Sequence, residues 1–144
     1  MAVPARISLV TLGVADLVGT TRFYEALGFE FSPASVAGEV SFFRTGGAIL
    51  ALWGAVDLAA DAGLTPPSLE GFRGVAYAIN LASQAEVDAA LDDAEAAGGL
   101  VVKRAVATDW GGYSGYFADP EANLWEVAHN PHWPLDENGL PVLP

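Results

Sequence analysis

A pattern of one strand, one helix and three further strands occurs twice along the chain. This repeat constrains the fold more than any other feature. The first copy is predicted to have strands at 7–14, 29–32, 40–44 and 48–53 and a helix at 17–27. The second copy is predicted to have strands at 74–81, 100–104, 112–118 and 123–128, with a helix that begins after Ser83. The sequence therefore predicts an α+β fold, with two βαβββ modules that form a curved mixed sheet around a cleft.

Local signals support both predicted helices. Asp16 precedes the first helix and can accept a hydrogen bond from its free backbone amides, while Gly28 is placed to end it. Ser83 and Glu86 have the spacing of a capping box, in which two free backbone donors are satisfied reciprocally. These signals place the helices at equivalent points in the two modules.

The length of 144 residues suits a single domain. We divide it into module 1 at about 5–54, a connector at about 55–73, module 2 at about 74–130 and an irregular tail at 131–144. The connector contains Pro66-Pro67 and a short stretch, 56–62, that could form a helical turn. The tail contains four prolines, which disfavour regular structure.

Composition excludes several classes of function. Six Lys and Arg residues against 18 Asp and Glu give a formal net charge of −12. Such a chain repels the phosphates of nucleic acid and of anionic membranes, so neither is an expected partner. Because there are no cysteines, disulfides, zinc–thiolate sites and thiol nucleophiles are excluded.

Targeting signals are also missing from the sequence as given. No apolar run approaches the ~18 residues of a membrane-spanning helix, and residues 1–14 lack the pattern of a signal peptide. We therefore expect a cytoplasmic protein that does not associate with membranes. Neither a phosphate-binding glycine loop followed by a helix nor a Gly-x-Ser-x-Gly motif is present.

Three stretches resemble the vicinal oxygen chelate superfamily, which comprises glyoxalases, bleomycin resistance proteins and extradiol dioxygenases. They are Leu9–Leu17, Phe23–Phe29 and Phe117–Val127. The resemblance spans about residues 5–130, with Ala122 in place of the usual Gly in the final turn. It implies the two-module fold. The same fold hosts isomerases, dioxygenases, thiol transferases and metal-free drug-binding proteins, so function has to be argued from the site.

The resemblance also implies where a metal site would lie. Enzymes of this superfamily draw ligands from positions that correspond to Leu9, Ala51, Gly74 and Glu126. Only Glu126 has a donor side chain, whereas a well-held divalent ion needs at least three protein ligands. We therefore predict no cofactor and no bound divalent metal. His129 and His132 follow Glu126, but strand alternation and a proline-broken tail separate them from it.

Glu126 is the candidate catalytic or ligand-binding residue. If Trp125 and Val127 face the helix, alternation makes Glu126 face the cleft. There it serves as a polar anchor or general base, or it is a relic of an ancestral metal site, bonded to a tyrosine or water. Tyr116 lies ten residues earlier, where extradiol dioxygenases have a pocket tyrosine; it either donates a hydrogen bond to a ligand or packs in the sheet.

Aromatic residues complete the predicted ligand site. Trp110 and Tyr113 flank Gly111-Gly112 in a loop that could cover a planar ligand, and Trp53 belongs to the first module. The alternative is that these rings pack in the core or anchor the loop. The predicted ligand-binding residues are Glu126, Tyr116, Trp110, Tyr113 and Trp53.

Three functions are compatible with these patterns. The first is a metal-free protein that binds a small molecule in an aromatic-lined cleft. The second is a lyase, isomerase or dioxygenase that uses Glu126 with an unconventional metal site or without metal. The third is a protein whose cleft is filled and whose role is interaction. A homodimer is expected in each case, because proteins of this resemblance pair their modules within or between chains.

Overall fold

The structure, a computed structural model, describes residues 2–144. Each module consists of a strand, a helix and three strands, as predicted, and a further helix occupies the connector. Module 1 contains β1 (Leu9–Val14), α1 (Leu17–Leu27), β2 (Glu30–Phe31), β3 (Val40–Arg44) and β4 (Ile49–Gly54), followed by α2 (Ala55–Ala62). Module 2 contains β5 (Ala76–Asn80), α3 (Gln84–Ala96), β6 (Leu100–Ala107), β7 (Tyr113–Ala118) and β8 (Leu124–His129).

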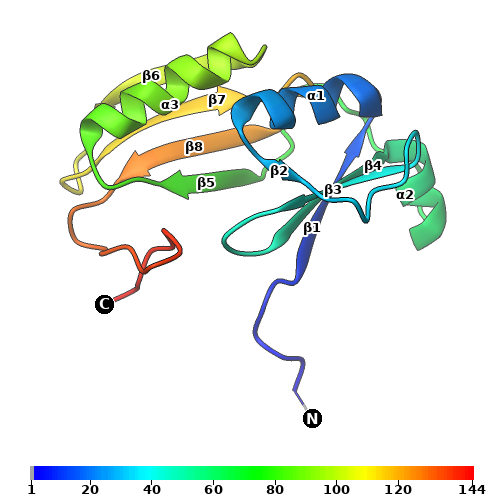
Figure 1. Ribbon diagram of the computed structural model, residues 1–144, viewed down its shortest axis with the longest axis horizontal. Coiled ribbons are helices and arrows are strands. Elements are labelled where there is room, and N and C mark those ends of the chain that lie inside the picture. Colours follow the sequence, from blue (N-terminus) through cyan, green and yellow to red (C-terminus); the bar gives the residue numbers. More distant parts are fainter. Residues whose placement is uncertain (1) are drawn as a thin grey trace.

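The strands form two four-stranded mixed sheets with the same internal order, β1-β4-β3-β2 and β5-β8-β7-β6. In each sheet the first strand of the module runs parallel to the last, and the other neighbours are antiparallel. Figure 1 shows the two sheets side by side, with α3 lying across the second sheet and α2 at the far side of the first. The α+β two-module fold predicted from the sequence is therefore confirmed.

The helix ends follow the predicted signals. The Asp16 carboxylate accepts a hydrogen bond from the Gly19 amide at 3.0 Å, and Gly28 ends α1 in the left-handed conformation with φ 104°. The Ser83 hydroxyl accepts from the Glu86 amide at 3.2 Å, while the Glu86 carboxylate accepts from the Ala82 amide at 2.9 Å. Both caps stabilise the start of a helix through groups that are close in sequence.

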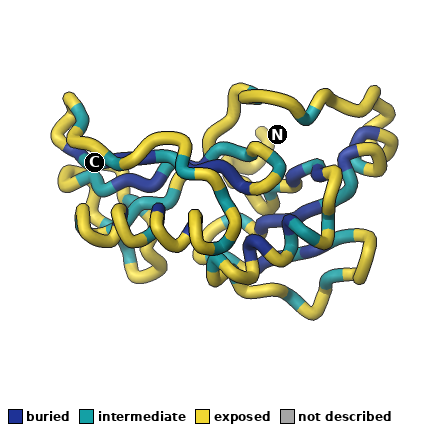
Figure 2. The backbone as a smooth tube through the Cα atoms, turned by 90° about the horizontal axis from the view of Figure 1, so that it is seen from above, coloured by how far each residue is buried: buried dark blue, intermediate teal, exposed yellow. Residues whose placement is uncertain are grey.

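A single hydrophobic core joins the modules. Helix α1 contributes Phe23 and Tyr24, whose rings lie 6.3 Å from Phe117 and 6.1 Å from Trp125 of module 2. Figure 2 shows buried backbone running through the strands of both modules, with the outer turns of the helices and the loops exposed. Since α1 touches both sheets, it holds the relative placement of the two modules.

The turn between β7 and β8 reinforces this junction. The buried Asp119 carboxylate accepts a hydrogen bond from the Tyr24 hydroxyl at 2.6 Å, and Trp125 Nε1 donates to the same Tyr24 oxygen at 3.0 Å. Asp119 also accepts from the Asn123 side-chain amide at 2.8 Å. The Glu121 carboxylate accepts from the Ala15 amide, so the turn is also bonded to the start of module 1.

Several segments differ from the predicted elements, among them β6, which continues to Ala107 beyond the predicted end at residue 104. Strand β5 begins at Ala76 rather than at Gly74, whose φ of 78° is left-handed and ends regular strand geometry. The connector forms the complete helix α2, which packs on β1 and β4 rather than forming a single turn. The tail is irregular as predicted, apart from an antiparallel bridge between Leu135 and Pro141. Among residues 2–144, no helix has the length and hydropathy required to cross a membrane.

Candidate functional site

Glu126 projects from β8 onto the side of the second sheet opposite α3. Its neighbours Trp125 and Val127 are 7% and 0% exposed in the core, because successive strand residues point to opposite faces. Glu126 is half-buried and pairs with Ala78 on β5 and with Tyr116 on β7. We call this surface, formed by Ala78, Ser114, Tyr116, Glu126 and Ala128, the open face.

Tyr116 and Glu126 interact directly on the open face. The Tyr116 hydroxyl donates a hydrogen bond to Glu126 Oε2 at 3.1 Å. Burial, followed by the negative charge of Glu126 and this hydrogen bond, raises the pKa of Tyr116 above its ordinary value. The phenol therefore stays protonated and is a donor at neutral pH. Lys103 on β6 pairs with Tyr116 in the sheet, and its side chain is exposed.

Small side chains surround this pair. Ala78 is exposed beside Glu126, while Ser114 and Ala128 are buried neighbours in the adjacent register. A carboxylate flanked by small residues is reachable by a ligand that approaches the sheet. The arrangement offers a negative acceptor in Glu126 and a neutral hydroxyl in Tyr116.

Tyr113 does not join them, in contrast to the prediction. It lies three residues from Tyr116 on the same strand, and an odd separation puts the two side chains on opposite faces. The Tyr113 hydroxyl donates to Asp88 of α3 at 2.7 Å, and its ring packs against the core. This hydrogen bond is the first cause that raises the pKa of Tyr113, ahead of burial and the Asp88 charge.

The two predicted tryptophans also lie apart from Glu126 in the fold. Trp110, 46% exposed, lies in the 108–112 loop, with its ring so close to Gly112 that any side chain at that position would collide with it. Trp53 belongs to β4 of the first sheet, where it pairs with Gly13 and Val40. Of the five predicted ligand-binding residues, the structure brings only Glu126 and Tyr116 into contact.

The positions at which the family resemblance implies metal ligands do not fit a metal here. Leu9 on β1 and Ala51 on β4 have hydrocarbon side chains and Gly74, before β5, has none, so none of the three supplies a donor atom. Within residues 2–144, no three His, Cys, Asp or Glu side chains come together in a way that could hold an ion. His129 instead directs Nδ1 to the Leu81 carbonyl at 3.0 Å. Because a carbonyl only accepts, that nitrogen is the donor.

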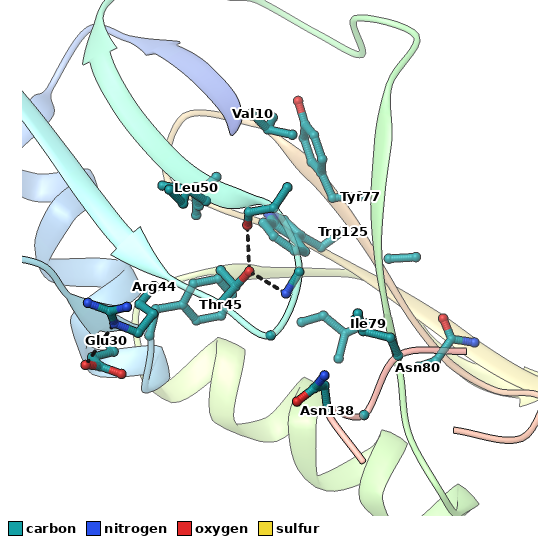
Figure 3. A pocket seen from close by; sticks show the side chains of 18 of the residues that line it. Val10, Glu30, Arg44, Thr45, Leu50, Tyr77, Ile79, Asn80, Trp125 and Asn138 are labelled. Carbon is teal, nitrogen blue, oxygen red and sulfur yellow. Dashed lines mark hydrogen bonds and ion pairs between the residues drawn. The ribbon is translucent and has the colours of Figure 1, made fainter. Parts of the chain in front are cut away.

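A groove between the modules is a further cavity, which sequence reasoning missed. Its volume is about 900 Å³, and we call it the inter-module groove. It is bounded by the β3–β4 hairpin, the end of α1, strand β5 and the 138–141 segment of the tail (Figure 3). Its aromatic side chains are Phe29, Tyr77 and Trp125. These residues come from separate parts of the chain, and no local pattern indicates that they meet.

Comparison with known proteins adds the family. Residues 6–127 match the family model described as Glyoxalase/Bleomycin resistance protein/Dioxygenase superfamily. No curated protein matches the chain.

Solved structures are similar over nearly the whole length. A glyoxalase-related enzyme from Fulvimarina pelagi is 33% identical, with 97% of this chain and 99% of that chain covered and a TM-score of 0.86. Lactoylglutathione lyase from Agrobacterium tumefaciens is 28% identical, covering 92% of this chain and 99% of that chain, with a TM-score of 0.69. A glyoxalase/bleomycin resistance protein/dioxygenase from Nocardioides is also 28% identical, with 90% of this chain and 85% of that chain covered and a TM-score of 0.73. The chain belongs to the Glyoxalase/Bleomycin resistance protein/Dioxygenase superfamily.

Proposed function

We propose that the protein binds a small molecule on the open face without a metal ion, with Glu126 as the polar anchor. The observation that carries this proposal is the Tyr116–Glu126 hydrogen bond on a face lined by small residues. The donor set supports the metal-free part, since Leu9, Ala51 and Gly74 leave Glu126 as the one donor among the four family positions.

Charge indicates the kind of ligand. Tyr116 occupies one carboxylate oxygen of Glu126, and no hydrogen bond within residues 2–144 occupies the other. That oxygen suits a cation or a hydrogen-bond donor. The net charge of −12 attracts cations to the molecule as a whole. We therefore favour a cationic or hydrogen-bond-donating ligand.

An enzyme of the lyase, isomerase or dioxygenase type is the second candidate. Glu126 supplies a proton acceptor and Tyr116 a proton donor, with Glu126 Oε2 and the Tyr116 hydroxyl oxygen 3.1 Å apart. General acid–base catalysis requires such a pair of groups. The similarity to the lactoylglutathione lyase from A. tumefaciens supports this reading at 28% identity. Turnover that disappears in Glu126→Gln and does not require added divalent metal would favour the enzyme over the binding protein.

The binding proposal is tested by a thermal-shift screen of small planar and cationic compounds. Glu126→Gln keeps the size of the side chain but removes its charge, and should lose about 1–3 kcal/mol of ligand affinity. Tyr116→Phe should have a smaller effect, because it removes only the neighbouring hydroxyl. Glu39→Gln, at an exposed loop position, is the matched control. If every stabilising compound acts equally on wild type and Glu126→Gln, Glu126 is not the anchor.

We also expect the chain to form a homodimer. On the first sheet, Leu9 and Ile49 are neighbours across β1 and β4, and they are 47% and 42% exposed. Together with Phe42 they border a hollow of about 270 Å³. Contiguous exposed apolar side chains of this kind are typical of protein interfaces.

Sedimentation at micromolar concentration tests the dimer. The wild type should sediment as a dimer, and Ile49→Lys should shift it towards monomer by placing a charge on that apolar surface. Lysine at Val102, an exposed position on β6, provides the control and should leave the dimer intact. A wild type that sediments only as a monomer would contradict the expectation.

A further inference from the structure

We propose that the inter-module groove is a second ligand site, which takes an uncharged planar aromatic molecule. It shares Ala78 of the edge strand β5 with the open face, but Glu126 and Tyr116 do not line it. Trp125, which does line it, points to the opposite side of β8 from Glu126.

The aromatic wall carries the first part of the argument. Trp125 stands edge-on to Phe29, with centroids 5.8 Å apart and an interplanar angle of 87°. Trp125 also packs against Tyr77, with centroids 5.2 Å apart and an interplanar angle of 44°. These rings come from three separate segments and support one another, so they form a preformed apolar surface. At about 900 Å³ the groove is within the size range of small-molecule sites.

The charges of the lining are balanced. Its two charged residues, Glu30 and Arg44, form an ion pair with Nε and Oε1 3.5 Å apart, and both side chains are mostly exposed. No unbalanced charge within the groove would attract an ion. The net charge of −12 on the whole chain additionally opposes anions. A neutral ligand therefore fits the groove better than a charged one.

One amide side chain, that of Asn138, supplies polarity at one end of the groove. Figure 3 shows Asn138 of the tail near Ile79, whereas Asn80 lies on the other side of β5, in keeping with its pairing with Ala128. Within residues 2–144, no hydrogen bond occupies the Asn138 side-chain amide. This amide offers both a donor and an acceptor, which suits a hydroxyl or carbonyl group on an aromatic ring.

The tail forms a ready-made rim. The Asp136 carboxylate accepts from the Asn138 and Leu140 amides at 2.8 and 3.0 Å, so the loop is held by its own hydrogen bonds. It meets the β3–β4 turn closely, since a β-carbon at Gly46 would lie 2.9 Å from the Asn138 carbonyl oxygen. The groove mouth is therefore bordered by a loop that does not depend on a ligand for its shape.

Fluorescence titration with Nile red, a neutral planar dye, tests the proposal. The wild type should bind it saturably with one dye per chain. Ile79→Trp places a larger ring in the groove and should lower the affinity at least tenfold. Val102→Trp adds the same ring at an exposed position on β6 and should leave the affinity within twofold. Absence of saturable binding, or an equal loss in both variants, would overturn the proposal.

Three further measurements control for loss of folding, test the ligand class and distinguish the groove from the open face. If circular dichroism shows Ile79→Trp to be unfolded, the variant Asn138→Ala decides the question: a three- to tenfold loss is expected, and unchanged affinity overturns the proposal. 1-Naphthol should displace the dye at least tenfold better than 1-naphthalenesulfonate, and equal displacement refutes the neutral class. Glu126→Gln should not alter dye binding. If it does, the dye occupies the open face and the groove proposal fails while the proposed function stands.

Discussion

Ala122 has a backbone conformation that is costly for its residue type. With φ 64° it is the one non-glycine residue between 2 and 144 in the left-handed region, within the turn that joins β7 to β8. This is the position at which the family resemblance implies glycine. A residue with a β-carbon in this region is strained by about 1–2 kcal/mol, and glycine avoids this strain. Part of the gain is lost because glycine has a larger conformational entropy in the unfolded chain.

We therefore expect Ala122→Gly to stabilise the protein by about 1 kcal/mol, measured by equilibrium urea denaturation. Ala89→Gly, at an exposed position inside α3, should instead destabilise it by about 1 kcal/mol, because glycine is a poor helix former. A destabilised Ala122→Gly variant would show that the turn does not bear this strain.

At the scale of elements, α3 packs tightly where it crosses β7 and β6. A β-carbon at Gly115 would lie 2.7 Å from Leu91 of α3, 2.7 Å from the Lys103 carbonyl oxygen and 2.8 Å from the Ala105 amide nitrogen. Two of these atoms are backbone atoms of β6, which cannot move aside by changing rotamer. The irregular register between β6 and β7 lies at the same place.

Gly115→Ala should therefore destabilise the protein by about 1–3 kcal/mol, because β6 has to shift. Gly47→Ala is the matched control, since its nearest neighbours would lie 3.6 and 3.8 Å away in ordinary contact. We expect that control to change stability by less than about 0.5 kcal/mol. Equal effects in the two variants, measured by urea denaturation, would contradict the packing argument.

At the scale of the whole molecule, Tyr24 joins the two modules and makes the stability of the folded protein fall at high pH. Burial first, followed by the charge and hydrogen bond of Asp119, raises its pKa well above 10.0. The folded protein then holds the phenol proton more tightly than the unfolded chain. This stabilisation is complete below about pH 10, and it is lost as pH rises from there through the folded-state pKa.

The free energy of unfolding should consequently fall above pH 10, by up to ~1.4 kcal/mol per pH unit for each proton held only by the folded state. Tyr24→Phe removes one such proton, so its profile should be flatter above pH 10, although it is less stable at neutral pH from the lost hydrogen bonds. Tyr113→Phe is the comparison at a half-exposed tyrosine whose pKa is also raised, chiefly by its hydrogen bond to Asp88, and it should flatten the profile less than Tyr24→Phe. Denaturation at pH 8 to 11 measures both profiles, and parallel curves for wild type and Tyr24→Phe would refute the role of Tyr24.

Much of the architecture could be predicted from the sequence, because its causes are local. Asp16 and Gly28 delimit α1, Ser83 starts α3, and alternation puts Trp125 in the core and Glu126 on the opposite face. Helix capping and strand alternation act between residues a few positions apart, so the order of residues is sufficient to read them.

The candidate sites depend on contacts that local patterns do not contain. Strand alternation, which places Glu126 correctly, also puts Tyr113 on the opposite face of the sheet from Tyr116 and Glu126. The clustering of aromatic residues in the sequence does not reveal this, because it carries no information on strand register. The inter-module groove is even harder to predict from the sequence. It brings together the β3–β4 hairpin, β5 and Asn138, which are far apart along the chain. Its shape follows from the packing of Tyr24, Asp119 and Trp125 between the modules, a long-range arrangement that exists only once both modules have folded.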